Sequence, residues 1–169
     1  MRKQKGFSLI ELLIVVAIIL IIAAIAIPNL LRAKIAANES SAAASVRTLV
    51  TANIEYQTAY PAAGYAAALT NLGPGGTTCA ATGPTSTNAC IIDAVLASGT
   101  KSGYTIASAG TVPIGTANTQ FNISATPQTA NSTGVKGFCA DEDGVVRSES
   151  PASASETAHD TCLNVAAMQ

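Results

Sequence analysis

KGFSLIELLIVVAIILIIAAIAIP, residues 5–28, is the stretch that decides the fold. Between Phe7 and Ile27 it carries a single charged residue, Glu11, and the five residues before Gly6 include three bases and no acid. A helix of this length extends about 32 Å, which is the thickness of a bilayer's hydrocarbon core. The stretch therefore predicts a membrane-spanning helix with its N-terminus in the cytoplasm and the rest of the chain outside.

Glu11 is unusual in a membrane helix. An ionised side chain costs about 2.5–3.5 kcal/mol at the membrane midplane and less near the ends. An ordinary secretory signal, with Ala24-Ile25-Ala26 as its cleavage site, would have a shorter apolar region and no acid. A plain single-pass anchor would leave both Gly6 and Glu11 unexplained. The acid therefore indicates a specific function for this segment.

The run from Lys5-Gly6-Phe7-Ser8-Leu9-Ile10-Glu11 to Ala26-Ile27-Pro28 resembles the class III signal of type IV pilins and pseudopilins. The resemblance implies that a prepilin peptidase cuts between Gly6 and Phe7 and that the new amino group of Phe7 is methylated. It also implies that Glu11 is the acid used in assembly. It divides the chain into a leader at 1–6, a transmembrane and assembly helix at 7–28, an amphipathic half of the same helix at 29–60 and a globular head at 61–169.

The chemistry of the segment agrees with this resemblance. Cleavage before Phe7 would leave an α-amine with a reference pKa of about 7.7–8.0, mostly cationic at neutral pH. Glu11 lies about 6 Å further along the helix axis. The amine of one subunit and the Glu11 carboxylate of a neighbour can pair if parallel helices are staggered by one to two turns. A buried pair adds little net stability, but loss of one partner costs about 3–5 kcal/mol, so the pair would set the stagger.

The helical pattern continues beyond Pro28 to about Ala59, ended by Tyr60-Pro61. Because proline lacks an N–H and clashes with the preceding turn, we expect a kink at Pro28. The second half of the helix has one apolar stripe for a globular domain, made of Leu31, Ile35, Ala42, Val46, Leu49/Val50, Asn53/Ile54 and Gln57.

The head is predicted to be mainly β. Short helices are expected at Tyr65–Gly73 and Ile91–Ala97, separated by a Gly/Thr/Pro-rich loop. Four short strands are predicted to follow, at Gly103–Ala107, Thr119–Ala125, Gly137–Ala140 and Val145–Ser148. Asp143-Gly144, between the last two, is a strong signal for a hairpin turn. We expect an α+β fold in which a four-stranded antiparallel meander packs on the helix around Val46–Ile54; the pilin resemblance implies a ladle shape.

Four cysteines, Cys79, Cys90, Cys139 and Cys162, follow the membrane segment and suit an oxidising compartment. They allow three connectivities. We expect nearest-neighbour pairing, Cys79–Cys90 and Cys139–Cys162. The second pair would match the C-terminal disulfide loop of many type IV pilins.

Composition and motifs argue against several other functions. The net charge is −1 and no basic stripe is present, so direct nucleic-acid binding is not predicted. The single histidine, His159, lies in a small-residue tail, and no nucleophile elbow is present, so we expect neither an enzyme nor a cofactor. No metal site is predicted: the cysteine spacing does not suit zinc, and Asp141-Glu142-Asp143-Gly144 lacks EF-hand spacing and reads as a turn.

The sequence thus predicts a structural subunit of a type IV pilus. By the resemblance, its partners are copies of itself, the prepilin peptidase, and an inner-membrane assembly platform with its cytoplasmic ATPase. The precursor would lie in the bacterial inner membrane and the assembled product in an extracellular pilus. The alternatives are a pseudopilin of a type II secretion system and, from another class, a single-pass membrane-anchored binding domain outside the cytoplasm that never polymerises.

Overall fold

A computed structural model describes residues 7–75, 79, 83–152, 162–163 and 167–168. The chain divides into two compact units, Met1–Lys34 and Ile35–Gln169, which are described separately. The helix α1 is assigned to Leu9–Ala59, with Pro28 inside it. A long N-terminal helix is therefore confirmed, while the expected kink at Pro28 stays a prediction.

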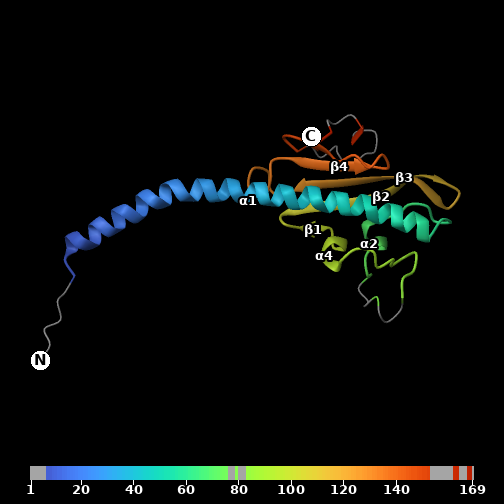
Figure 1. Ribbon diagram of the computed structural model, residues 1–169, viewed down its shortest axis with the longest axis horizontal. Helices are drawn as coiled ribbons and strands as arrows, with labels where there is room; N and C mark the ends of the chain where they lie inside the picture. The colour runs from blue at the N-terminus through green and yellow to red at the C-terminus, as the bar shows by residue number, and fades with distance from the viewer. Residues whose placement is uncertain (1–6, 76–78, 80–82, 153–161, 164–166, 169) are drawn as a thin grey trace, which may run out of the picture. The chain divides into compact units, whose positions relative to one another are not determined.

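In the second unit, α1 packs on a five-stranded antiparallel sheet (Figure 1). The strands occur in meander order, and two short helices, α2 (Leu69–Leu72) and α4 (Ala94–Ala97), precede them. The strands are β1 (Thr100–Lys101), β2 (Tyr104–Ile114), β3 (Ala117–Pro127), β4 (Gly137–Asp141) and β5 (Arg147–Glu149). The α+β class and the meander are as predicted.

The prediction of four strands was wrong, because β1 adds a fifth. Lys101 pairs with Tyr104 across a two-residue loop, Ser102-Gly103, in which both residues have positive φ, +51° and +74°. This is the geometry of the hairpin turns that match strand twist. A two-residue strand has no alternating pattern of its own, so only the Ser-Gly pair marked it in the sequence.

The other elements differ from prediction mainly in length. β2 and β3 are 11 residues each and form one long hairpin with a two-residue turn at Gly115-Thr116. β2 continues through Gly110 and Pro113, which are disfavoured inside strands, so the sequence indicated an earlier end of this strand. The helices α2 and α4 are shorter than expected; α4 begins at Asp93, whose side chain accepts a hydrogen bond from the Leu96 N–H at 2.9 Å.

The core lies between α1 and one face of the sheet. The predicted stripe is buried from Ala42 to Asn53, as expected, but its end is not: Ile54 is 49% exposed and Gln57 is exposed. The Asn53 amide group is accommodated because it donates to Leu49 O and to Ser108 Oγ of β2. The sheet contributes three large buried aromatic residues, Tyr104, Phe121 and Phe138.

Replacing Gly64 by alanine should destabilise the head. Gly64 has φ +70°, and an added Cβ would lie 2.1 Å from the carbonyl oxygen of Asn118 in β3. Left-handed backbone alone costs a non-glycine residue about 1–3 kcal/mol, and the contact with main-chain atoms adds to it. We expect the melting temperature of the detergent-solubilised chain to fall by at least roughly 2–4 °C per kcal/mol.

Gly115→Ala is the matched control for that prediction. Gly115 has nearly the same backbone angle, φ +66°, but nothing lies within 4 Å of an added Cβ. Its variant should therefore lose only the stability associated with the backbone conformation. Equal melting temperatures for the two variants would show that the Gly64–Asn118 contact does not stabilise the head.

Candidate assembly segment

From Leu9, the described residues of the first unit form an apolar helix, the N-terminal part of α1. Every large aliphatic side chain from Leu9 to Leu31 is exposed, and Phe7, just before the helix, is 82% exposed. Within the described residues, α1 alone is long and apolar enough to cross a membrane. So large an exposed apolar surface is characteristic of a segment that is covered by lipid or by other protein chains.

Glu11 is held at the N-terminal end of this helix. Ser8 immediately precedes α1, and its backbone N–H donates a hydrogen bond to Glu11 Oε2 at 2.9 Å. The Ser8 carbonyl accepts the first helical bond, from Leu12 N–H at 3.3 Å. The bond between the Ser8 N–H and the Glu11 carboxylate is one half of a capping box, in which a Glu at the third helical position accepts a hydrogen bond from the N–H of the capping residue.

The cap directs the Glu11 carboxylate toward the end of the chain that cleavage before Phe7 would create. The amide that Glu11 accepts from belongs to Ser8, the next residue after Phe7. An amine on Phe7 would therefore arise one residue away from the carboxylate. The sequence prediction named Glu11 but missed Ser8, although the Ser-x-x-Glu spacing at residues 8–11 is the known signature of such a cap.

The predicted cleavage position is only partly described. Gly6 and the rest of the predicted leader lie outside the described residues. Phe7 is described and exposed, and it precedes the helix. Cleavage between Gly6 and Phe7, methylation of Phe7 and the assembly function of Glu11 accordingly remain proposals, which are developed below.

The four cysteines form two disulfides, Cys79–Cys90 and Cys139–Cys162. The first closes a loop between α2 and α4. The second joins β4 to a residue close to the C-terminus, and both of its cysteines are fully buried. The C-terminal residues are held further by an N–H of Met168 that donates to Val146 O at 3.0 Å.

The acidic run at residues 141–144 forms a turn, as expected. The Gly144 N–H donates to Asp141 O at 3.0 Å, and the turn connects β4 to β5. Arg147 of β5 returns to the acids: its guanidinium bonds both oxygens of Asp143 and lies 3.6 Å from Asp141 Oδ1. Among the described residues no group of three or more His, Cys, Asp or Glu is arranged to hold a metal ion. His159 lies outside those residues.

Asp141 is fully buried, which the sequence did not predict. It pairs across the strands with the buried Asn122 of β3, and Asp141 Oδ2 and Asn122 Nδ2 both lack a hydrogen-bond partner among the described residues. Burial, followed by the neighbouring Asp143, raises the pKa of Asp141 from 3.8 to about 6. The hydrogen bond from Arg147 holds the pKa of Asp143 well below its usual range.

These shifts predict how the stability of the head depends on pH. The raised pKa of Asp141 contributes stability that is complete below its ordinary value of 3.8 and is lost as the pH rises through about 6. The lowered pKa of Asp143 contributes stability above its ordinary value, which is lost at more acidic pH. We therefore expect the melting temperature to fall between about pH 4 and pH 6, and Asp141→Asn to flatten that slope.

The slope is measured by thermal unfolding of the detergent-solubilised chain at a series of pH values. Glu55→Gln, which removes an exposed carboxylate on α1, should leave the slope as it is in the natural chain. If the melting temperature of Asp141→Asn depends on pH as steeply as that of the natural chain, groups other than Asp141 cause the dependence.

The N-terminal segment is similar to segments of known proteins. Residues 1–27 match the family described as the prokaryotic N-terminal methylation motif. The chain is 53% identical over 57 residues to the type IV wide pilus major component PilA4 of Thermus thermophilus, covering 34% of this chain and 44% of that protein. It is 50% identical over 50 residues to the type IV major pilin protein PilA of Myxococcus xanthus, covering 30% and 23% of the two chains.

The matches thus span less than half the length of either relative. No solved structure matches the chain. The matched motif includes Phe7 and Glu11, and the fold joins the long N-terminal helix to an antiparallel sheet with two disulfides. In its N-terminal motif and over the segments that it shares with these relatives, the chain is similar to type IV pilins.

Proposed function

We propose that this chain is the precursor of a major type IV pilus subunit, a structural protein without enzymatic activity. The observation that carries the proposal is the geometry of Glu11, a carboxylate turned toward the N-terminal end of a helix whose large aliphatic side chains from Leu9 to Leu31 are all exposed. Both relatives are described as major pilins or pilus components, which supports the same function here.

Processing would begin at the membrane. Prepilin peptidase would remove the leader, residues 1–6, and Phe7 would become the methylated N-terminus. Residues 7–28 would hold the subunit in the inner membrane until an assembly platform with its ATPase extracts it. Residues 29–60 would continue the helix, and residues 61–169 would form the head outside the membrane. Moving the apolar segment from lipid into a bundle of similar helices changes its apolar environment little, so extraction and return can be reversible.

Glu11 would set the position of each new subunit. Inside an apolar bundle its carboxylate requires a partner, and the amine on Phe7 of a neighbouring subunit supplies one. To make that pair, Glu11 exchanges the Ser8 N–H of its own helix for the amine of a second helix. The contact that caps the helix in the single chain thus keeps the carboxylate at the correct end before assembly.

Intact mass spectrometry of fibres sheared from the cell surface tests this function. We expect a subunit that begins at Phe7, carries one added methyl group and has lost four hydrogens to its two disulfides. A mass that corresponds to a subunit beginning at Met1, or to a chain cleaved after Ala26, would contradict the proposed function. Processed subunits that occur only in the cell envelope, with no surface fibre, would favour the pseudopilin alternative.

A further inference from the structure

The outer end of the β2–β3 hairpin presents an apolar tip to solvent. Ile114 is 71% exposed, more than any other large hydrophobic side chain of the described head, and Val112 is 53% exposed. Pro113 stands between them, so three consecutive apolar residues form the tip. Among the described residues, β4 pairs only with residues 122–125 of β3 and β1 only with residues 104–105 of β2. At the outer end of the hairpin only an isolated bridge, between Gly64 and Asn118, joins another segment.

The tip is nevertheless held firmly. Asn118, near the turn, exchanges backbone hydrogen bonds with the segment that follows α1: its N–H donates to Ala63 O at 2.9 Å and its carbonyl accepts from Tyr65 N–H at 3.0 Å. Its side-chain amide donates to Tyr65 O at 3.0 Å. Val112 has φ +50°, a conformation that a β-branched residue rarely adopts. The exposed side chains are therefore presented by a fixed backbone, some of it strained.

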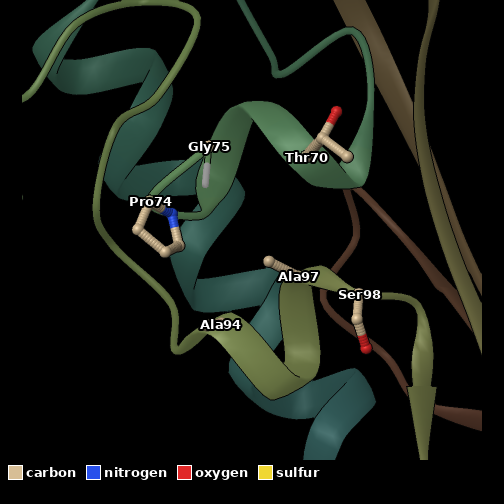
Figure 2. Close-up of a pocket in the computed structure, with 6 residues that line it drawn as sticks. All are labelled: Thr70, Pro74, Gly75, Ala94, Ala97 and Ser98. Atoms are coloured by element: carbon tan, nitrogen blue, oxygen red, sulfur yellow. The ribbon is translucent and has the colours of Figure 1, made fainter. Parts of the chain in front are cut away.

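A depression of complementary character lies elsewhere on the head, between α2 and α4. Its volume is about 290 Å³, and no charged residue lines it; the lining residues are Thr70, Pro74, Gly75, Ala94, Ala97 and Ser98. Figure 2 shows the Pro74 ring and the Ala97 methyl group facing this space, while the hydroxyls of Thr70 and Ser98 point away from it.

We propose that the tip, Val112–Ile114, seats in the α2–α4 depression of a second copy of this chain. The tip cannot fill the depression of its own chain, because Asn118 and Gly110 are bonded to residues 63–67, between the tip and α2. A projection on one surface and a hollow on another make a heterologous contact, the type that builds open helical filaments when the rotation does not close a ring. The proposal rests on the proposed function, since it requires that copies assemble.

Because the contact is small, we expect it to form only between subunits of an assembled fibre. Two or three side chains bury far less than the roughly 1,200–2,000 Å² of a stable protein interface. Free chains should therefore not dimerise through it. Once the N-terminal helices are bundled, neighbouring heads are at high effective concentration, and a weak contact repeated along the fibre is occupied.

Cysteine cross-linking in sheared fibres tests the contact. In the double variant Ile114→Cys with Ala94→Cys, mild oxidation should produce a ladder of dimers and higher oligomers in denaturing gels, which reductant collapses to monomer. The matched control combines Ile114→Cys with Ser132→Cys, at an exposed turn on another part of the head, and should give less than a tenth of the cross-linked product. Equal ladders in the two, or no ladder in normal fibres, would overturn the proposal.

Single variants decide the question if the double variant does not assemble. Ile114→Asp places a charge on the tip, and Ala94→Phe fills the depression from an exposed helix position. Each should lower the yield of sheared fibre at least tenfold without changing the melting temperature of the single chain, whereas Ser132→Asp should change neither. Normal fibre yield in both variants would refute the contact. If the natural chain itself forms no fibre that begins at Phe7, the proposed function fails instead.

Discussion

Glu11→Ala should abolish fibre assembly while leaving the head folded. The variant would place an unpaired amine from each neighbouring Phe7 inside an apolar bundle, and an unpaired buried charge costs about 3–5 kcal/mol. This corresponds to a loss of at least roughly a hundredfold in the equilibrium for adding one subunit. Because addition is repeated along a fibre, we expect no sheared fibre. The measurement is the yield of sheared subunit relative to the amount in the membrane.

Glu55→Ala is the control for a carboxylate on the same helix. Glu55 is exposed on the part of α1 that carries the head, and its loss should leave the fibre yield unchanged. The melting temperature of the Glu11→Ala subunit in detergent should equal that of the natural chain, because Glu11 lies outside the second unit. Normal fibres from Glu11→Ala would contradict the assembly function of this acid and would favour a membrane-anchored domain that does not polymerise.

Removing the Cys139–Cys162 disulfide should have the largest effect on the stability of the head. The bond closes a loop with a sequence separation of 23 residues, and loop-closure entropy assigns it about 3.5 kcal/mol. For a chain of 169 residues this corresponds to a fall of roughly 7–14 °C in melting temperature. The double variant Cys139→Ala with Cys162→Ala also loses packing, since both sulfurs are fully buried. Thermal unfolding in detergent measures the change.

The other disulfide provides the comparison. Cys79–Cys90 has a sequence separation of 11 residues, and the same entropy argument gives it about 2.8 kcal/mol. Its cysteines are only partly buried, so the double alanine variant should lose little packing and should unfold at a higher temperature than the Cys139/Cys162 variant. The reverse order would show that the C-terminal residues are held mainly by other contacts, such as the bond between Met168 and Val146.

The elements that the sequence predicted well are those with strong local signals. The helix was predicted from an uninterrupted apolar run and from the periodicity after Pro28, and Asp143-Gly144 marked the β4–β5 turn. The long β2–β3 hairpin was underestimated because β2 continues through Gly110 and Pro113, which are disfavoured inside strands. The predicted stripe correctly included Asn53 but also Ile54 and Gln57, which are exposed, because which of the last turns of α1 the sheet covers depends on tertiary packing.

Some residues of the candidate site could likewise be predicted from the sequence and others could not. Glu11 was identified because one acid in an apolar run is visible in the sequence, and Ser8 could have been identified from the spacing of a capping box. The burial of Asp141 and its contact with Arg147 could not be predicted, because they depend on the register of β4 against β3 and on the geometry of the β4–β5 turn. The tip and the depression likewise arise from tertiary structure, since their residues are ordinary loop and short-helix residues in the sequence.

A zero-length cross-link in isotopically mixed fibres tests most directly whether Glu11 pairs with a neighbour's amine. Fibres would be grown across a switch from light to heavy nitrogen, treated with a carbodiimide, digested and analysed by mass spectrometry. We predict an amide between the Phe7 nitrogen and the Glu11 carboxyl group in which one peptide is light and the other heavy. Cross-links found only between peptides of the same label, as expected for pairing within one chain, would contradict the account.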